Sequence, residues 1–181
     1  MSLIYEPAED SYLLESVIQN YAKNKSVIDI GTGSGILAKK AKKAGAKSVI
    51  ALDINKEALN QLKKKVKGIK LIKSDLFNNV KESYDLIICN PPYLPEDKEE
   101  DNESSLATSG GKKGDEFILN FLSQAKKHLN KNGIILLLVS SLTPKKEINI
   151  LLRKINLKKK TIASKKIFFE ILEVWKIQKE D

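Results

Sequence analysis

The sequence Asp85-Leu-Ile-Ile-Cys-Asn-Pro-Pro-Tyr93 decides how the rest of the chain is interpreted. Its apolar half predicts a buried strand, which must end at Asn90 because two consecutive prolines cannot donate the hydrogen bonds of a sheet. Pro91 and Pro92 have fixed φ angles and leave the segment stiff. We therefore expect Asn90 to present its side-chain oxygen, and Pro91 its backbone carbonyl, as two acceptors aimed at one point.

Such a pair of acceptors suits a planar group that carries an NH2, for example an amide or an exocyclic amine. The group would donate one proton to each oxygen while Tyr93 or Pro92 packs against its face. A simpler interpretation is a proline turn after a core strand, in which Asn90 only caps the turn. This stretch alone leaves both interpretations open.

A glycine-rich turn follows an earlier strand. Residues 26–30 are rich in β-branched side chains and predict a strand, and Asp29 then leads into Gly31, Gly33 and Gly35 before a helix. Glycines let a backbone approach a ligand closely, and a helix start offers unpaired N–H groups. The pattern is Gly-x-Gly-x-Gly, which departs from the Gly-x-Gly-x-x-Gly of dinucleotide-binding proteins. The turn predicts a binding loop without choosing its ligand.

Two further predicted strands end in acidic residues. Asp53 follows the strand at 48–52 and stands 22 residues after Gly31, close to the spacing at which an acidic residue binds the two hydroxyls of a ribose. A carboxylate in that position has few structural uses, which favours a ligand role. Asp75 follows the strand at 69–73, where it is either a ligand residue or a turn residue.

Strands that alternate with helices predict an α/β fold with a mostly parallel, doubly wound sheet. In that fold the carboxyl ends of the strands share one edge, where ligands bind. One crevice should therefore collect the four strand-end residues, Asp29, Asp53, Asp75 and Asn90. The last two predicted strands, 158–164 and 168–177, are joined by only a few residues and should form an antiparallel hairpin at one edge of the sheet.

The length of 181 residues predicts a single domain, residues 1–181. An N-terminal helical segment, 1–22, is expected to begin around Pro7 and to run to Tyr21. Residues 94–112 are expected to form an acidic and glycine-rich loop near the site, within which the acidic part, 95–105, should be a mobile loop or a lid. Periodicity predicts further elements, namely helices at 55–66, 115–129 and 145–155 and a strand at 134–139 in the centre of the sheet.

The composition argues against several kinds of site. One cysteine, Cys89, rules out an internal disulfide, and one histidine, His128, argues against a zinc site built by this chain, so we expect no metal ligands. No apolar run is long enough for a membrane span and no secretory signal is visible, which predicts a cytoplasmic protein. The net charge is +9, but the lysine clusters fall mainly on polar faces of predicted helices. This distribution favours a solvated surface over a nucleic-acid site.

Taken in order, the motifs at 29–35, Asp53, Asp75 and 90–93 resemble those of the class I S-adenosylmethionine-dependent methyltransferases. More narrowly, the chain resembles the HemK family of protein-glutamine N5-methyltransferases. That family often has glutamate where this chain has Asp29, which is a modest departure. The resemblance implies a Rossmann-like fold with a seven-stranded sheet, mostly parallel, whose last strand is antiparallel.

Two further motifs are similar to the short branch of the family found in archaea and eukaryotes. They are Glu6-Pro-Ala-Glu-Asp-Ser11 and Ala107-Thr108-x-Gly110-Gly111-x-x-Gly114. That branch modifies the glutamine of the Gly-Gly-Gln loop in class 1 translation termination factors. The resemblance therefore implies a translation termination factor as the protein substrate. It also implies a small zinc-binding activator protein that pairs with the strand at Ile69 to Lys73.

The resemblance implies S-adenosylmethionine as the cofactor and a set of site residues. The implied cofactor contacts are Ser11, Asp29, Gly31, Gly33, Gly35, Asp53, Asp75, Leu76 and Asn90. The implied catalytic residues are Asn90, Pro91, Pro92 and Tyr93, with Asn90 touching both the cofactor and the substrate glutamine. The acidic stretch at 95–105 is unusually charged for the family, which leaves its part in substrate docking open.

Two other functions stay open at this point. Adenine-N6 methylation of DNA or RNA is the first, since Asn-Pro-Pro-Tyr suits any planar NH2 donor and a flipped base satisfies it as well as a glutamine does. The lack of aromatic residues interleaved with the lysines, and the acidic stretch beside Asn90, weigh against a nucleic-acid substrate. The second is a non-catalytic nucleotide-binding scaffold, which would leave the strand-end residues without a chemical role.

Overall fold

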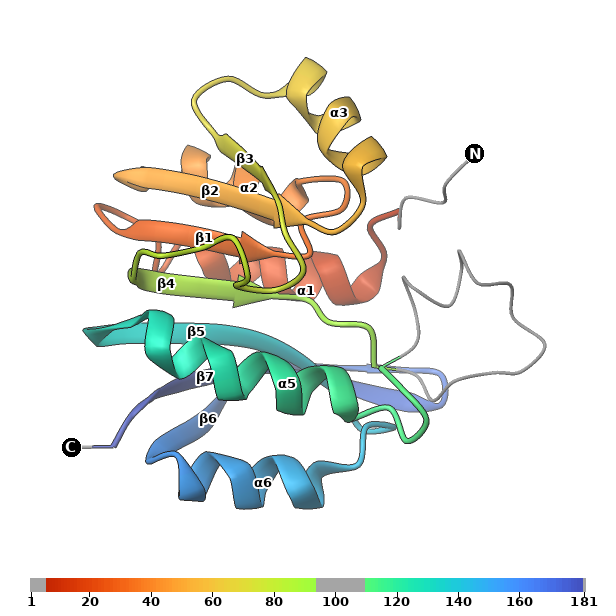
Figure 1. The fold of residues 1–181 in the computed structure, drawn as a ribbon. Helices are drawn as coiled ribbons and strands as arrows, with labels where there is room; N and C mark the ends of the chain where they lie inside the picture. The colour runs from red at the N-terminus through yellow and green to blue at the C-terminus, as the bar shows by residue number, and fades with distance from the viewer. Residues whose placement is uncertain (1–5, 94–109, 181) are drawn as a thin grey trace.

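The computed structural model describes residues 6–93 and 110–180. The expectations for the acidic stretch at 95–105 and for the motif residues Ala107 and Thr108 lie outside the described residues. Within the described ranges the chain forms one seven-stranded sheet with helices on both faces (Figure 1). This architecture confirms the predicted α/β fold.

The strand order in the sheet is β3-β2-β1-β4-β5-β7-β6. Neighbours from β3 to β5 pair in parallel, and β7 runs antiparallel between β5 and β6. The strands are β1 (Ser26–Ile30), β2 (Ser48–Asp53), β3 (Lys70–Lys73), β4 (Tyr84–Cys89), β5 (Leu129–Ser140), β6 (Leu157–Ile167) and β7 (Glu170–Lys179). The predicted antiparallel last strand and the hairpin at one edge are both confirmed.

Two layers of helices cover the two faces of the sheet. The helices are α1 (Glu9–Ile18), α2 (Ile36–Lys43), α3 (Lys56–Lys65), α5 (Glu116–Ala125) and α6 (Lys145–Lys154), with a short 3-10 helix η1 (Lys126–His128) after α5. Apolar side chains of α1, α2 and α3 pack in one core cluster, and those of α5 and α6 pack in the other. Figure 1 shows α5 and α6 together on one side of the strands.

The apolar run of β4, residues 86–89, is covered on both faces of the sheet. Successive side chains of a strand point to opposite faces, so Leu86 and Ile88 join the cluster of α1, whereas Ile87 and Cys89 join the cluster of α5. All four side chains are fully buried. A stretch of strand covered on both faces is apolar at nearly every position, and β4 stops where the first proline follows Asn90.

The start of the first helix differs from the prediction. α1 begins at Glu9 with Ala8 as its N-cap, two residues after Pro7, around which the helix was predicted to begin. The helix ends at Ile18 rather than at Tyr21, because the backbone turns there and the Tyr21 N–H donates to Ile18 O. Glu9 and Asp10 occupy the first turn, where carboxylates interact favourably with the positive end of the helix dipole.

The predicted helix at 115–129 is also shorter than expected. It ends at Ala125, and Leu129 opens β5, five residues before the predicted strand start at Ile134. Leu129 pairs with Tyr84, and the register then shifts before Ile134 pairs with Leu86. The expectation that this strand is the centre of the sheet was wrong as well, since β4 holds the middle place. Residues 86–89 of β4 and 134–139 of β5 are both uninterrupted apolar runs, so composition could not rank the two strands.

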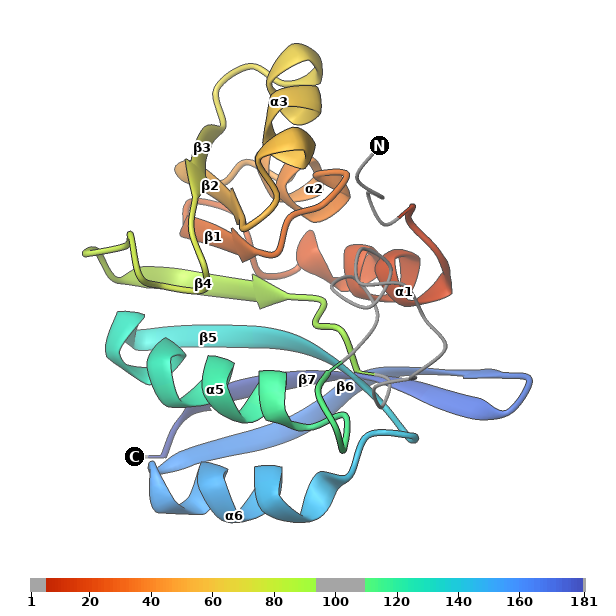
Figure 2. The same ribbon diagram turned by 45° about the vertical axis from the view of Figure 1, so that its right-hand side comes forward.

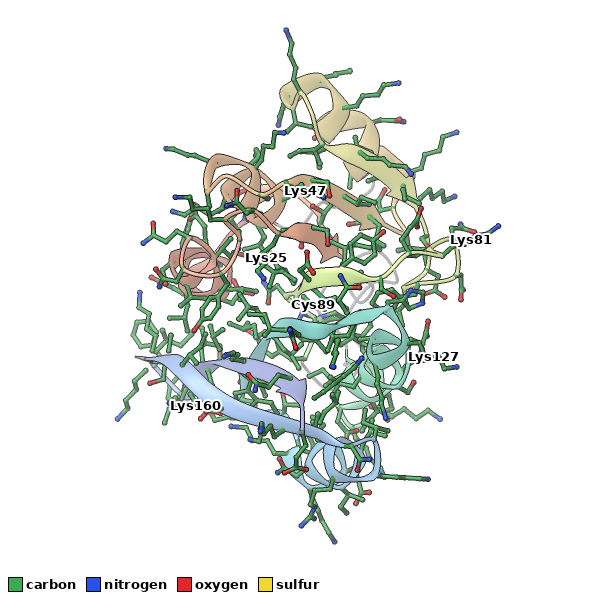
Figure 3. The ribbon with its side chains drawn as sticks, turned by 90° about the vertical axis from the view of Figure 1, so that its left-hand side faces the viewer. Lys25, Lys47, Lys81, Cys89, Lys127 and Lys160 are labelled. Carbon is green, nitrogen blue, oxygen red and sulfur yellow. The ribbon has the colours of Figure 1, made fainter. Side chains whose placement is uncertain are left out.

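The lysines are distributed over the surface. Figure 3 looks at the amino ends of the parallel strands and shows Lys25, Lys47, Lys81 and Lys127 well apart from one another. Cys89 lies among the core side chains, where burial raises the pKa of its thiol well above the usual value. Among the residues that the structure describes, no helix is both long and apolar enough to cross a membrane.

Candidate active site

The ends of the parallel strands lie side by side at one edge of the sheet, on the right of Figure 1. Backbone hydrogen bonds join the turns that follow these strands. The Thr32 N–H donates to Leu52 O over 2.9 Å, and the Ser74 N–H donates to Asp53 O over 3.0 Å. On the other side of β1, Ile30 is level with Cys89 of β4. The predicted crevice at the strand ends therefore has a connected framework.

Asp53 ends β2 and is mostly buried. Its Oδ2 accepts the Gly33 N–H over 2.8 Å, and its Oδ1 accepts the Asn55 N–H over 2.9 Å. The carboxylate thus fixes the glycine-rich turn against the end of β2. An ionised carboxylate offers about four lone-pair sites, so both oxygens keep capacity for further donors such as ribose hydroxyls.

Asp29 is fully buried beneath the same turn. Its Oδ2 accepts the Thr32 hydroxyl over 2.7 Å and the Ala38 N–H over 3.1 Å. Ala38 lies in the first turn of α2, whose N-cap residue, Gly35, has no side chain to offer. Asp29 therefore caps α2 from a neighbouring strand and holds the turn in shape. Its assignment as a direct cofactor contact stays a prediction.

Burial raises the pKa of Asp29 to about 7, against the opposing effect of its bonds from Thr32 and Ala38. The cause is the removal of the carboxylate from water, and its Oδ1 is buried with no hydrogen-bond partner in the described part of the chain. The nearby negative charge of Asp53 adds to the shift. The turn is therefore built on a carboxyl group that changes charge near neutral pH.

Two glycines of the turn differ in what surrounds them. Gly31 has a φ angle of 68°, and a Cβ atom there would meet nothing within 4 Å, so its backbone is open to a ligand. Gly35 has a φ angle of 76°, but a Cβ atom there would lie only 2.3 Å from Leu62 Cδ1 of α3. Gly35 thus permits helix packing, whereas Gly31 offers a surface for close approach.

The turn after β3 carries Asp75 and Leu76. Asp75 is exposed, whereas Leu76 is buried in the core and has a φ angle of 43°. Ser74 fixes this turn, because its hydroxyl donates to Leu76 O over 2.8 Å and accepts the Asn79 N–H over 3.0 Å. A leucine with positive φ is uncommon and marks a turn whose shape is imposed by its surroundings. The turn leaves the Asp75 carboxylate accessible next to the end of β2.

Asn90 is held by two residues of α1. Its Nδ2 donates to Asp10 Oδ2 over 2.9 Å and to Ser11 Oγ over 3.2 Å. Because the carboxylate of Asp10 can only accept, it fixes the amide with Nδ2 toward α1. Among the residues that the structure describes, Asn90 Oδ1 is then left buried without a hydrogen-bond partner. An unpaired buried acceptor is costly, and a ligand that donates an N–H to this oxygen would relieve that cost.

The residues after Asn90 close the site. Pro91 is buried, and Tyr93 is partly buried and packs against the core cluster of α1. Burial, with the charges of Asp10 and Glu170, raises the pKa of Tyr93 above its usual range, so its hydroxyl stays protonated. A Cβ atom at Gly110 would lie 2.9 Å from Pro92 O, so the end of the glycine-rich segment packs directly against the proline pair.

The structure also reveals site residues that the sequence interpretation missed. Asp10 enters the sequence interpretation only within the motif at 6–11, yet it is buried and accepts a hydrogen bond from Asn90, 80 residues away in the sequence. Thr32 was unremarked, yet it links Asp29 to the backbone of β2. A polar triplet, Glu9-Asp10-Ser11, beside the buried Leu14 is the signal that could have marked Asp10. The orientation of Pro91 O as a second acceptor stays a prediction.

Comparisons with known proteins agree with this arrangement. The sequence model of the methyltransferase small domain family matches residues 9–173. A protein of Methanocaldococcus jannaschii, named provisionally as a protein N5-glutamine methyltransferase, is 38% identical over 183 residues. The match covers 96% of this chain and 92% of that protein.

Two solved structures are similar over nearly the whole chain. One is the Mtq2-Trm112 complex of E. cuniculi, described as responsible for methylation of the eRF1 translation termination factor, with 27% identity and a TM-score of 0.78 over 97% of this chain and 98% of that chain. The other is the ribosomal protein L11 methylase of Lactobacillus delbrueckii subsp. bulgaricus, with 25% identity and a TM-score of 0.72 over 99% of this chain and 82% of that chain.

We expect the two glycines of the turn to respond differently to alanine. Gly35→Ala should destabilise the fold by about 2–4 kcal/mol, because a methyl group would clash with Leu62 and a left-handed φ angle would be imposed on alanine. Gly31→Ala should cost only about 1 kcal/mol, since its methyl group enters open space. Urea unfolding of both variants measures the difference, and equal losses would contradict the packing role of Gly35.

The pKa of Asp29 predicts a pH dependence of stability. The folded-state pKa of about 7 lies above the unfolded value near 3.8, so protonation of Asp29 favours the folded state. Its contribution to the free energy of unfolding is complete below pH 4 and is lost as pH rises through 7. Between pH 5 and pH 8 the loss should be roughly 2–3 kcal/mol. Asp29→Asn cannot ionise, so its free energy of unfolding should not show this loss. Between pH 5 and pH 8 the difference in unfolding free energy between the variant and the wild type should therefore increase by that amount in favour of the variant. Parallel pH profiles for the two proteins would refute the assignment.

Proposed function

Because this chain belongs to the methyltransferase small domain family, we propose that it transfers the methyl group of S-adenosylmethionine to the side-chain nitrogen of a glutamine in a translation termination factor. The observation that carries the proposal is the buried Oδ1 of Asn90, which has no hydrogen-bond partner in residues 6–93 and 110–180 and whose amide is held in one orientation by Asp10. A primary amide supplies the N–H group that this oxygen lacks.

The residues at the strand ends fit a methyl donor built on a nucleoside. Asp53 keeps acceptor capacity for ribose hydroxyls, and Gly31 offers an open backbone for the part of the donor that lies along the turn. The exposed Asp75 and the backbone of Leu76 would meet the base. Ser11 would lie at the opposite end, next to Asn90. When bound, S-adenosylmethionine supplies an electrophilic methyl group whose bond to sulfur breaks as the bond to nitrogen forms.

The chain's own residues would prepare the amide nitrogen for attack. Asn90 Oδ1 would accept one N–H of the substrate, and Pro91 O would accept the other. With both protons held by acceptors, the nitrogen lone pair is free to point away from them, toward the methyl group. Tyr93, kept neutral, would pack against the amide plane. Positioning of this kind can account for about 7–11 kcal/mol of a barrier, and the nitrogen loses its surplus proton to water after transfer.

The choice of substrate is supported by the comparisons. The name of the M. jannaschii relative gives glutamine as the modified residue, and the E. cuniculi complex gives a translation termination factor as the modified protein. The similarity to a ribosomal protein methylase shows that this fold also serves other protein substrates. A cytoplasmic location follows from the proposed substrate.

A small partner protein would cover β3. This strand pairs with β2 on one side and stands at the end of the sheet order, so its other side is available for pairing. Leu71 and Ile72 are only partly buried there. We propose that a small zinc-binding protein adds to this strand. The similar Mtq2 chain is found in a complex with a second protein, Trm112, which supports a protein partner. The strand itself begins at Lys70 rather than at the predicted Ile69.

The test is a radiolabelled methyl-transfer assay in which the purified protein is incubated separately with each of four candidate substrates. They are a class 1 termination factor, the same factor with its loop glutamine replaced by alanine, ribosomal protein L11, and duplex DNA or RNA. We expect label only in the unmodified factor. Labelled adenine would favour the nucleic-acid alternative, since the N6 amine of adenine also offers an N–H to Asn90 Oδ1. Label in the factor whose loop glutamine is replaced by alanine would contradict methylation of that glutamine.

We expect Asn90→Ala and Asp53→Ala to fail at different steps. Asn90→Ala removes the substrate acceptor, so turnover should fall at least about 100-fold while the affinity for S-adenosylmethionine changes less than about threefold. Asp53→Ala removes the anchor of the glycine-rich turn and the ribose acceptor, so cofactor affinity should fall at least about tenfold. Calorimetry and single-turnover assays separate the two effects, and identical profiles would contradict the assignment.

Asp10 should act only through Asn90. Asp10→Ala would let the Asn90 amide flip and present Nδ2, a donor, to the substrate. The catalytic rate should therefore fall about 10- to 100-fold with cofactor affinity retained. Asp10→Asn keeps one acceptor oxygen and should recover part of the activity. In Asn90→Ala, the further change Asp10→Ala should have little additional effect. Losses that multiply in this double variant would point to an independent role for Asp10.

A further inference from the structure

Two aromatic side chains stand fully in solvent at the tip of the β6–β7 hairpin. Phe168 and Phe169 are each 96% exposed, whereas the other large exposed apolar residues that the structure describes reach at most 53%. The sequence predicted that Phe168 opens the last strand, but β7 begins at Glu170 and both phenylalanines lie in the turn. Two adjacent phenylalanines in water are unfavourable unless another surface covers them.

The hairpin tip points to the same edge of the sheet as the active site. Cys89 is level with Leu137, so Asn90 is level with Leu138, and Leu138 pairs with Val174 of β7. The tip lies five residues beyond Val174, which places it roughly 17 Å past Asn90 along the strands. Figure 2 shows the hairpin, in blue, extending beyond the ends of the parallel strands on the side of α1.

The hairpin is tied to the residues that surround Asn90. Lys165 forms an ion pair with Glu9, which directly precedes Asp10 in α1. The Ile171 N–H donates to Ser141 Oγ over 2.9 Å, the Ser141 N–H donates to Ile171 O over 2.8 Å, and the Ser140 hydroxyl bonds Glu170. Strand pairing continues up to Ile167 and Glu170. The tip is therefore held in a defined position relative to the site.

This geometry requires a large partner. With two strand spacings of about 4.8 Å added to the advance along the strands, the tip lies about 20 Å from Asn90. A five-residue peptide centred on the reacting glutamine reaches only about 7 Å to either side. A folded protein that places a glutamine at Asn90 would extend far enough to cover both phenylalanines. Exposed aromatic side chains at such a distance suit an apolar pocket on that protein.

We propose that Phe168 and Phe169, here called the aromatic tip, form a docking surface for the protein substrate. The proposal rests on the proposed function, because that function brings a folded protein to this edge of the sheet. The aromatic tip would bind an apolar pocket of the substrate outside the loop that carries the glutamine. Lys166, exposed beside the tip, favours a pocket with acidic groups at its rim.

The test compares the double variant Phe168→Ser/Phe169→Ser with the wild type on two substrates. For the intact termination factor, we expect KM to rise about 10- to 100-fold with little change in kcat. For a five-residue peptide centred on the glutamine, kinetics and cofactor affinity should stay unchanged. Ile150→Ser is the matched control, since Ile150 is an exposed apolar residue on α6. It should leave both substrates unaffected.

The possible outcomes separate the two proposals. A wild-type protein that does not methylate the factor defeats the proposed function. A wild type that methylates it, with an unchanged KM in the double variant, overturns the docking surface alone. Equal losses on factor and peptide would also overturn it, because the tip would then act through the site. A wild-type dimer, or binding to labelled RNA, that disappears in the double variant would assign the tip to a second copy or to nucleic acid instead.

Discussion

The hydrogen bond between the Asp10 carboxylate and the Asn90 amide is the contact on which the site depends. It joins the first turn of α1 to the end of β4, and it decides which atom of the amide points away from α1. That bond forms only because α1 packs on the sheet through buried residues such as Leu14 and Ile18. The core of the protein thus sets the direction of a single oxygen atom.

Much of the fold could be predicted from local pattern. Strands buried on both faces are mostly apolar, two prolines must end a strand, and acidic residues at strand ends have few structural uses. These rules placed Asp53 and Asn90 correctly at strand ends. The polar triplet at 9–11 could have marked Asp10, but its contact with Asn90 could not be predicted, because the two residues are 80 positions apart in the sequence.

The errors in the predicted bounds of the helices and strands have one physical origin. Leu129 has an apolar side chain at helical spacing from Ala125, so periodicity extended the helix over it, but pairing with Tyr84 draws it into β5. Pro7 is a favourable first residue of a helix, yet α1 starts two residues later, where Glu9 can reach Lys165 and Asp10 can reach Asn90. In each case a tertiary contact outweighed a local preference.

The burial of Cys89 has a practical consequence. The chain contains no other cysteine, and this thiol is fully buried with a raised pKa, so it is poorly suited to react with maleimides or oxidants in the folded state. A cysteine introduced anywhere on the surface would therefore be the principal reactive thiol of the native protein. Spectroscopic labels could be attached at chosen sites without first removing the natural residue, and reactivity of Cys89 itself would report unfolding.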